Sequence, residues 1–119
     1  MDSQRPQSTV DMWTFRESTL EPTGLIGYSV EARDGGIGKV DEATGEAGRS
    51  QIIVDTGPWI FGKKVLLPAG VIERVDPDTE TVFVTRTKDE IKNAPEFDSD
   101  SRRDDEEYRS RLGGYYEGL

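Results

Sequence analysis

The hydrophobic residues of this chain are concentrated in its middle, in short runs separated by turn-forming residues. Residues 24–86 contain 25 hydrophobic residues in 63 positions, whereas the other 56 positions contain only 14. A chain of 119 residues is long enough for one hydrophobic core but not for two. The distribution therefore predicts one domain at residues 20–97, an N-terminal extension at 1–19, and an acidic C-terminal tail at 98–119 whose composition favours disorder.

Six short segments have the pattern of β-strands. Residues 28–33 alternate apolar with polar side chains, as a half-buried strand does, and residues 51–55 form a β-branched run typical of a strand buried on both faces. The predicted strands are residues 28–33, 37–41, 51–55, 63–67, 71–75 and 81–86. Their close spacing predicts an all-β fold, a small barrel or sandwich of about six strands.

Glycine, proline and aspartate mark the connections between these strands. Asp34-Gly35-Gly36 has the residues of a tight hairpin turn, and Gly38 indicates a β-bulge or the close approach of another backbone. Residues 42–49 are polar and are interpreted as a loop, and Pro68 is expected to end the fourth strand. Asp76-Pro77-Asp78-Thr79 is a turn by its residue types.

One short helix is predicted after the last strand. Thr87 and Glu90 have the spacing of a capping box, in which each residue accepts a hydrogen bond from the backbone of the other. Pro95 is expected to stop this helix. From Asp98 to Arg111 almost every residue is charged or hydroxylic and no apolar stripe is present, so disorder is the preferred interpretation of that stretch.

Composition excludes several classes of function. The chain has no histidine and no cysteine, which excludes Ser-His and Cys-His catalytic pairs, disulfides, zinc fingers and histidine-ligated metals. Its formal net charge of -9 argues against general binding to nucleic-acid phosphates. No stretch resembles a secretory signal or approaches the roughly 20 apolar residues of a membrane span. We therefore expect a cytoplasmic protein without a membrane span and without catalytic or metal sites built on histidine or cysteine.

Three motifs that superficially indicate chemistry have simpler interpretations. The hairpin at residues 34–39 lacks the first glycine and the final Ser or Thr of a phosphate-binding loop. The acidic residues at 76, 78 and 80 lie in a segment shorter than a calcium-binding loop, and a solvated turn is favoured. The carboxylates at 104–107 have no apolar surroundings to shift a pKa, so we interpret them as solvated charge.

Several segments together resemble the PRC-barrel family, which includes domains of the photosynthetic reaction-centre H subunit and of the ribosome maturation factor RimM. The resemblance rests on Gly27 to Val30, Asp34 to Val40, Ile53 to Asp55 and Val65 to Pro68, and it covers roughly residues 20–97. It is strongest with small stand-alone bacterial PRC-barrel proteins. The resemblance implies a small, partly open β-barrel that holds other macromolecules, with no common catalytic residues and no shared cofactor.

Two segments are candidates for contact with a partner. Trp59-Ile60-Phe61 either caps one open end of the barrel or projects as a contact surface, with Lys63 and Lys64 beside it to pair with acidic groups. The tail carries aromatic and aliphatic anchors after its acidic stretch, and the hypothesis is that they dock on another copy or another protein. The candidate interaction residues are Trp59, Ile60, Phe61, Lys63, Lys64, Tyr108, Tyr115, Tyr116 and Leu119.

The sequence therefore favours a non-catalytic protein-interaction or scaffold module, and its small core and open strand edges favour a homodimer. One alternative is a small-barrel nucleic-acid-binding protein. Its basic patch would be Lys39, Lys63, Lys64, Arg74 and Arg86. The second alternative is a metal-dependent hydrolase that uses carboxylates.

Overall fold

Six β-strands form one sheet in the computed structural model, which describes residues 12–15, 21–45, 50–57, 64–95 and 106–119. The predicted all-β class with about six strands and a short helix after them is confirmed. The strands are β1 (Ser29–Ala32), β2 (Gly35–Thr44), β3 (Gln51–Asp55), β4 (Lys64–Pro68), β5 (Ile72–Asp76) and β6 (Thr81–Val84).

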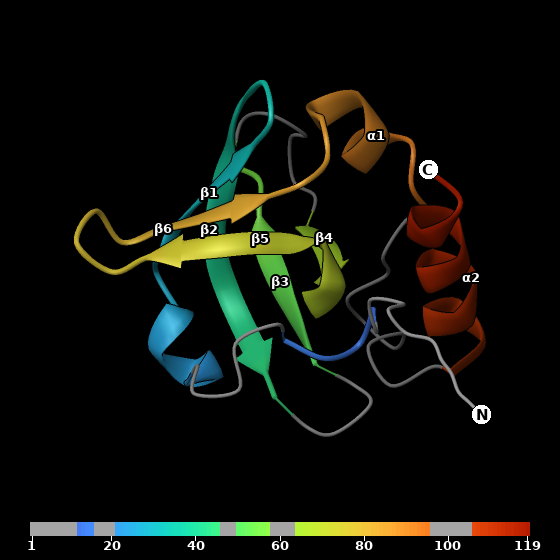
Figure 1. Cartoon of the computed structure of the whole chain (residues 1–119), viewed down its shortest axis with the longest axis horizontal. Helices are drawn as coiled ribbons and strands as arrows, with labels where there is room; N and C mark the ends of the chain where they lie inside the picture. The colour runs from blue at the N-terminus through green and yellow to red at the C-terminus, as the bar shows by residue number, and fades with distance from the viewer. Residues whose placement is uncertain (1–11, 16–20, 46–49, 58–63, 96–105) are drawn as a thin grey trace, which may run out of the picture.

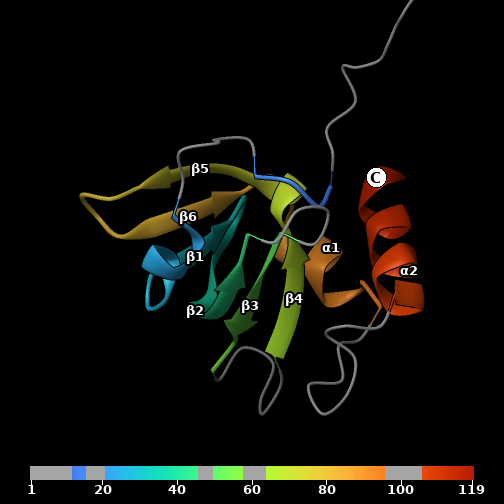
Figure 2. The same ribbon diagram turned by 90° about the horizontal axis from the view of Figure 1, so that it is seen from below.

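The sheet curls into a small barrel-like shape because of the way the chain connects its two ends. The spatial order is β4-β3-β2-β1-β6-β5, so β4 and β5 lie at opposite ends of the sheet. In the sequence, however, only the short 3-10 helix η3 (Ala69–Val71) separates them. Thr85 after β6 donates its backbone N–H to the carbonyl of Val71 at 2.8 Å, which ties η3 to the β6 side. Figure 2 shows the resulting curvature, with β5 and β4 bending toward each other through η3.

The hairpin between β1 and β2 differs in detail from its prediction. Its two-residue turn is Arg33-Asp34, because Gly35 and Gly36 already pair with Ala32 and Glu31 as the first residues of β2. The predicted loop at 42–49 is also partly wrong, since β2 extends to Thr44 and pairs there with β3. The first half of β2, from Gly35 to Lys39, pairs with β1, and the second half, from Lys39 to Thr44, pairs with β3.

Gly38 lies where another backbone passes very close, as its position in the sequence predicted. Its φ is +151°, and a Cβ built there would lie 2.0 Å from the carbonyl oxygen of Asp55 in β3. The β1–β2 register shifts beside it, between Val30 and Glu31. Only glycine allows β2 and β3 to approach this closely at that backbone conformation.

Inward-facing aliphatic side chains fill the interior of the curled sheet. Val30 and Ala32 of β1 point inward with Val82 and Val84 of β6, while the residues between them face outward. The fully buried side chains with less than 2% exposure include Ile37, Ile52, Leu66, Leu67 and Val71. This period-two alternation is the pattern that the sequence predicted for half-buried strands.

Helix α1 (Lys88–Lys92) begins with the predicted capping box. The Thr87 hydroxyl accepts the backbone N–H of Glu90 at 3.2 Å, and the Glu90 carboxylate accepts the backbone N–H of Thr87 at 2.9 Å. The helix ends at Lys92, before Pro95, as expected. Ile91 is its one buried residue and attaches the helix to the core.

Helix α2 (Glu106–Glu117) replaces the disorder that the sequence favoured up to Arg111. Tyr108, Leu112 and Tyr116 follow one another at four-residue spacing, so they share one face, and each is at most 2% exposed. Gly113 and Gly114 make the helix intrinsically weak, since each glycine costs roughly 1 kcal/mol relative to alanine. Packing of the tyrosine–leucine face on the core therefore supplies the stability that the isolated segment lacks. Figure 1 shows α2 at the right-hand side of the molecule, beside α1.

Residues 12–15, inside the predicted N-terminal extension, link the sheet to α2. Met12 is 8% exposed and accepts the backbone N–H of Gly70, and the carbonyl of Trp13 accepts that of Ser50 just before β3. On its other side Trp13 contacts α2, where a Cβ on Gly113 would lie 3.0 Å from the indole Nε1. The guanidinium of Arg109 lies 5.9 Å from the centre of the indole ring.

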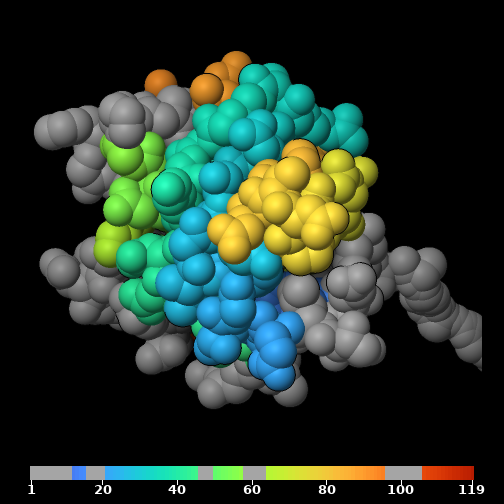
Figure 3. All heavy atoms as spheres, turned by 90° about the vertical axis from the view of Figure 1, so that its left-hand side faces the viewer, coloured from blue at the N-terminus to red at the C-terminus, as the bar shows by residue number. Residues whose placement is uncertain are grey.

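The face opposite α2 is formed largely by residues 21–44 and the β5–β6 hairpin, as the space-filling view shows (Figure 3). The 3-10 helix η2 (Pro22–Leu25) lies on this side, and Leu25 anchors it in the core. Within the described ranges, no helix combines the length and the apolar character needed to span a membrane.

Candidate functional site

The outer face of β1, β6 and β5 carries a row of three side chains of different chemistry. Cross-strand pairing places Glu31 beside Phe83 and Phe83 beside Arg74. The guanidinium carbon of Arg74 lies 4.0 Å from the centre of the Phe83 ring, which is cation–π geometry. Glu31 leans over the hairpin backbone, since a Cβ on Gly36 would lie 3.1 Å from its carboxylate. This row of carboxylate, aromatic ring and guanidinium is called the outer row below.

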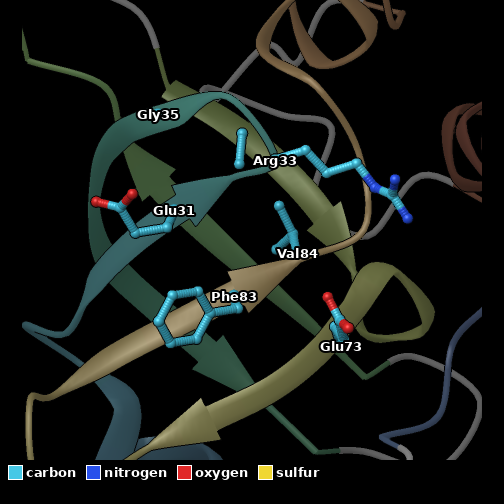
Figure 4. A pocket seen from close by; sticks show the side chains of 7 residues that line it. Glu31, Arg33, Gly35, Glu73, Phe83 and Val84 are labelled. Atoms are coloured by element: carbon cyan, nitrogen blue, oxygen red, sulfur yellow. The ribbon is translucent and has the colours of Figure 1, made fainter.

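A β-bulge places a second carboxylate next to the outer row. The β5–β6 register passes from Ile72 opposite Val84 to Arg74 opposite Phe83, so Glu73 has no residue directly opposite it. Such bulges redirect a side chain and recur near functional sites. The outer face beside the row is hollowed into an open pocket of about 440 Å³. Its walls are Glu31, Ala32, Arg33, Gly35, Glu73, Phe83 and Val84, and Figure 4 shows Phe83 and Glu73 approaching it from neighbouring strands.

A second, smaller cavity adjoins the first and shares Arg33 with it. This cavity has a volume of about 280 Å³ and is lined by Arg33, Thr85, Arg86, Thr87 and Glu90. In Figure 4 the Arg33 side chain extends away from Phe83, toward the chain that leaves β6. Its Nε–H donates to the carbonyl of Thr85 at 2.6 Å. Arg33 therefore lies between a pocket with two carboxylates and a cavity with two guanidiniums.

The predicted contact turn lies mostly outside the described residues. This applies to Trp59, Ile60, Phe61 and Lys63, for which the prediction of a core cap or contact surface stands as made. Lys64 is described and donates to the Asp41 carboxylate at 2.9 Å. This hydrogen bond, followed by the attraction of the Asp41 charge, raises the pKa of Lys64 above its ordinary value.

The tail residues find partners within this chain. The Tyr108 hydroxyl donates to the carbonyl of Pro95 at 3.0 Å, and the Tyr115 hydroxyl donates to the carbonyl of Glu90 at 2.6 Å. Tyr116 is 1% exposed, with its ring edge-to-face against Tyr115 at 5.1 Å. Leu119, in contrast, is 46% exposed. The structure thus brings the three tyrosines together on their own domain, with Leu119 at the surface.

Burial also changes the acidity of one of these tyrosines. Removal from water raises the pKa of Tyr116 far above its ordinary value, and the neighbouring Tyr115 and Tyr108 act in the same direction. Arg86 opposes the shift, since a nearby positive charge favours the phenolate. Docking of α2 therefore favours the neutral phenol of Tyr116 over its phenolate.

Two of the basic residues proposed for nucleic acid, Lys39 and Lys64, alternate with a carboxylate on the sheet. Lys39 of β2 lies opposite Asp55 of β3, and Asp55 lies opposite Lys64 of β4. A phosphate backbone needs lysines and arginines in an uninterrupted stripe. The alternation therefore gives the described part of this surface mixed charge.

The acidic turn after β5 has the predicted form. Asp76 accepts the backbone N–H of Asp78 at 3.0 Å, so the carboxylate stabilises the turn itself. Glu80 adopts a φ of 52°, which completes the reversal before β6. Within the described residues, no three acidic side chains converge in a way that would hold a metal ion.

Sequence reasoning did not predict the outer row. As candidates for binding it named only Arg74 of the outer row and only Arg86 of the residues that line the two cavities. The signal for Glu31 and Phe83 was their alternation with buried valines and alanine, which places them on the outer face. Their adjacency depends on the parallel pairing of β1 with β6, two strands about fifty residues apart in the sequence. That pairing has no local signature.

Comparison with known proteins identifies one relative of undetermined role. The chain is 36% identical over 86 residues to an uncharacterized protein from Deinococcus radiodurans, a match that covers 70% of this chain. The chain spans only 30% of that protein's length. No family model matches the sequence.

Proposed function

We propose that this chain is a non-catalytic protein-interaction module of the PRC-barrel type that self-associates through the outer row. The observation that carries the proposal is the stacking of Arg74 on the partly exposed ring of Phe83, with charged side chains around it. Aromatic and arginine side chains surrounded by a polar rim are the usual composition of energetic centres in protein interfaces. We expect the module to act in the cytoplasm, in keeping with its cysteine-free sequence.

The charges of this surface favour a second copy as the partner. The outer row and its pocket carry two carboxylates, from Glu31 and Glu73, and two guanidiniums, from Arg33 and Arg74. In a two-fold symmetric dimer the same patch meets itself, so a patch with both signs can pair acid with base across the axis. An acidic chain of net charge -9 would otherwise repel its own copy.

The Deinococcus relative supports the idea of a module. The matched segment forms a minor part of that longer protein, so a sequence of this kind occurs joined to other sequence. A small β-domain used as an attachment unit is expected to recur in this way.

The oligomeric state and the Phe83→Ala variant test the proposal. We expect sedimentation equilibrium to give a reversible dimer at micromolar concentration, and the variant to weaken it by about tenfold or more, as for an interface centre. Ile26→Ala is the matched control, because Ile26 is 52% exposed at the C-cap of η2 and is not one of the outer-row residues. A monomer across the whole concentration range, or equal weakening by both variants, would refute self-association through the outer row.

A further inference from the structure

Two neighbouring arginines form no ion pair with any carboxylate in the part of the chain that the structure describes. Arg33 and Arg86 line the 280 Å³ cavity together, and the chain has 24 acidic residues against 15 basic ones. Among the residues that the structure describes, neither guanidinium forms an ion pair. Two unneutralised guanidiniums on one cavity create a local positive potential that differs in sign from the molecule as a whole.

The backbone holds the two arginines in place. The N–H of Arg33 donates to the carbonyl of Arg86 at 2.9 Å, which extends the β1–β6 pairing past the end of both strands. The Arg33 Nε–H donates to the carbonyl of Thr85 at 2.6 Å, so this hydrogen bond orients the guanidinium and leaves its two terminal amino groups available. These hydrogen bonds therefore fix the backbones of both arginines and the orientation of the Arg33 guanidinium.

Arg86 has one donor that is sealed from solvent. Its Nε is buried and has no hydrogen-bond partner within the described residues. A ligand in the cavity would therefore meet the terminal amino groups of Arg86 and not its Nε. Thr85 and Thr87 also line the cavity. Thr87 accepts the N–H of Glu90 through its oxygen, which leaves its hydroxyl proton able to donate.

The carboxylate of Glu90 also belongs to the residues that line the cavity, and it could compete with a ligand for the arginines. A hydrogen bond to the backbone limits this competition. Glu90 accepts the backbone N–H of Thr87 through Oε1, so that oxygen is already engaged in capping α1. The side chains of the cavity then provide two positive charges against one negative charge, with far more donors than acceptors. A planar carboxylate ligand offers two oxygens to these donors. A phosphate monoester offers three terminal oxygens and up to two negative charges, so it can use more of the donors and balance both arginines.

We propose that Arg33, Arg86, Thr85 and Thr87 form a binding site for a phosphate monoester group. The arginines bind its terminal oxygens in the bidentate manner that planar guanidiniums favour, and the threonine hydroxyls donate to the remaining oxygen positions. This site shares Arg33 with the pocket beside the outer row but contains none of the three outer-row residues, and it does not rest on the self-association proposed above.

The direct test is a titration of the full chain with inorganic phosphate at constant ionic strength, followed by backbone amide NMR. We expect saturable shifts centred on Thr85, Arg86 and Thr87, and no comparable shifts with chloride at the same ionic strength. Shifts that are absent, that do not saturate, or that chloride reproduces would overturn the site.

Variants add a second, independent test. Arg86→Gln is expected to weaken phosphate binding by about tenfold or more, because it removes a charge-assisted donor pair. Arg74→Gln makes the same change of charge on the outer row and is expected to leave phosphate binding unchanged. If Arg86→Gln does not fold, Arg86→Lys keeps the charge and should still weaken binding several-fold, since lysine lacks the planar fork. Equal binding by the Arg86 and Arg74 variants would also overturn the site.

These variants separate this proposal from the previous one. Arg74→Gln and Phe83→Ala should weaken self-association and spare phosphate binding, whereas the Arg86 variants should do the opposite.

The source of the phosphate group follows from a second titration with a phosphothreonine peptide and its unphosphorylated form. Tighter binding of the phosphopeptide than of inorganic phosphate assigns the site to a phosphorylated protein, and equal binding assigns it to a small phosphate compound.

Discussion

Replacing Gly38 with alanine should destabilise the fold severely. The new Cβ would lie 2.0 Å from the carbonyl oxygen of Asp55 and 2.9 Å from its carbonyl carbon, both backbone atoms of β3. Because real Cβ atoms keep at least 3.0 Å from such neighbours, β3 would have to move by roughly 1 Å away from β2. That movement breaks the pairing at Lys39–Asp55, next to the substituted residue.

The magnitude follows from two costs. Forcing alanine into a φ of +151° and an overcrowded position costs about 1–3 kcal/mol of backbone strain. Each hydrogen bond lost between β2 and β3 adds about 1 kcal/mol. We therefore expect Gly38→Ala to lower the free energy of unfolding by about 3–5 kcal/mol, a large part of the about 5–15 kcal/mol of a typical domain.

Gly57→Ala provides the matched control. Gly57 also has a positive φ, +57°, but a Cβ there would meet no atom within 4 Å. Its replacement should cost only about 1–2 kcal/mol for the left-handed backbone. Urea unfolding followed by circular dichroism measures both variants. If Gly38→Ala loses no more stability than Gly57→Ala, the close approach of β2 and β3 is not what requires the glycine.

Three smaller perturbations test other contacts. Tyr115→Phe removes the 2.6 Å hydrogen bond to the Glu90 carbonyl and should lower the free energy of unfolding, measured in urea, by about 1 kcal/mol. An unchanged midpoint of urea unfolding would contradict this contact. Because burial raises the pKa of Tyr116 above 10.0 in the folded state only, the contribution of Tyr116 to stability should be full below pH 10.0 and fall as the pH rises beyond it. Phenolate absorbance from Tyr116 before unfolding would disagree. Asp41→Asn should lower the pKa of Lys64 toward 10.5, as measured by NMR, and should change the free energy of unfolding by less than about 1 kcal/mol. An unaltered pKa of Lys64 would argue against its pairing with Asp41.

The strands and helix α1 could be predicted because their signals are local. Alternation of buried and exposed positions in β1 and β6 follows directly from the two-residue period of a strand. The capping box of Thr87 and Glu90 requires only residues three positions apart. The hairpin turn was displaced by about one residue because Gly35 serves as the first residue of β2 instead of a turn residue.

Helix α2 and the two cavities could not be predicted because they depend on contacts between distant segments. The apolar stripe of α2 is only one residue wide, at Tyr108, Leu112 and Tyr116, and the residues buried beside it are Arg109 and Gly113. Its helical form depends on packing against Trp13, nearly a hundred residues earlier. The outer row likewise depends on the bulge at Glu73, which the sequence does not mark.

The contact between Trp13 and α2 has a consequence for the order in which the protein is made. The last strand ends at Val84, so a ribosome has delivered every strand before Arg109 and Gly113 are added to the chain. Segments synthesised first generally fold first. The indole of Trp13 therefore stays uncovered after the sheet has formed, until α2 has been synthesised and packs on it. We expect this apolar patch to be the site where a chaperone binds the nascent chain.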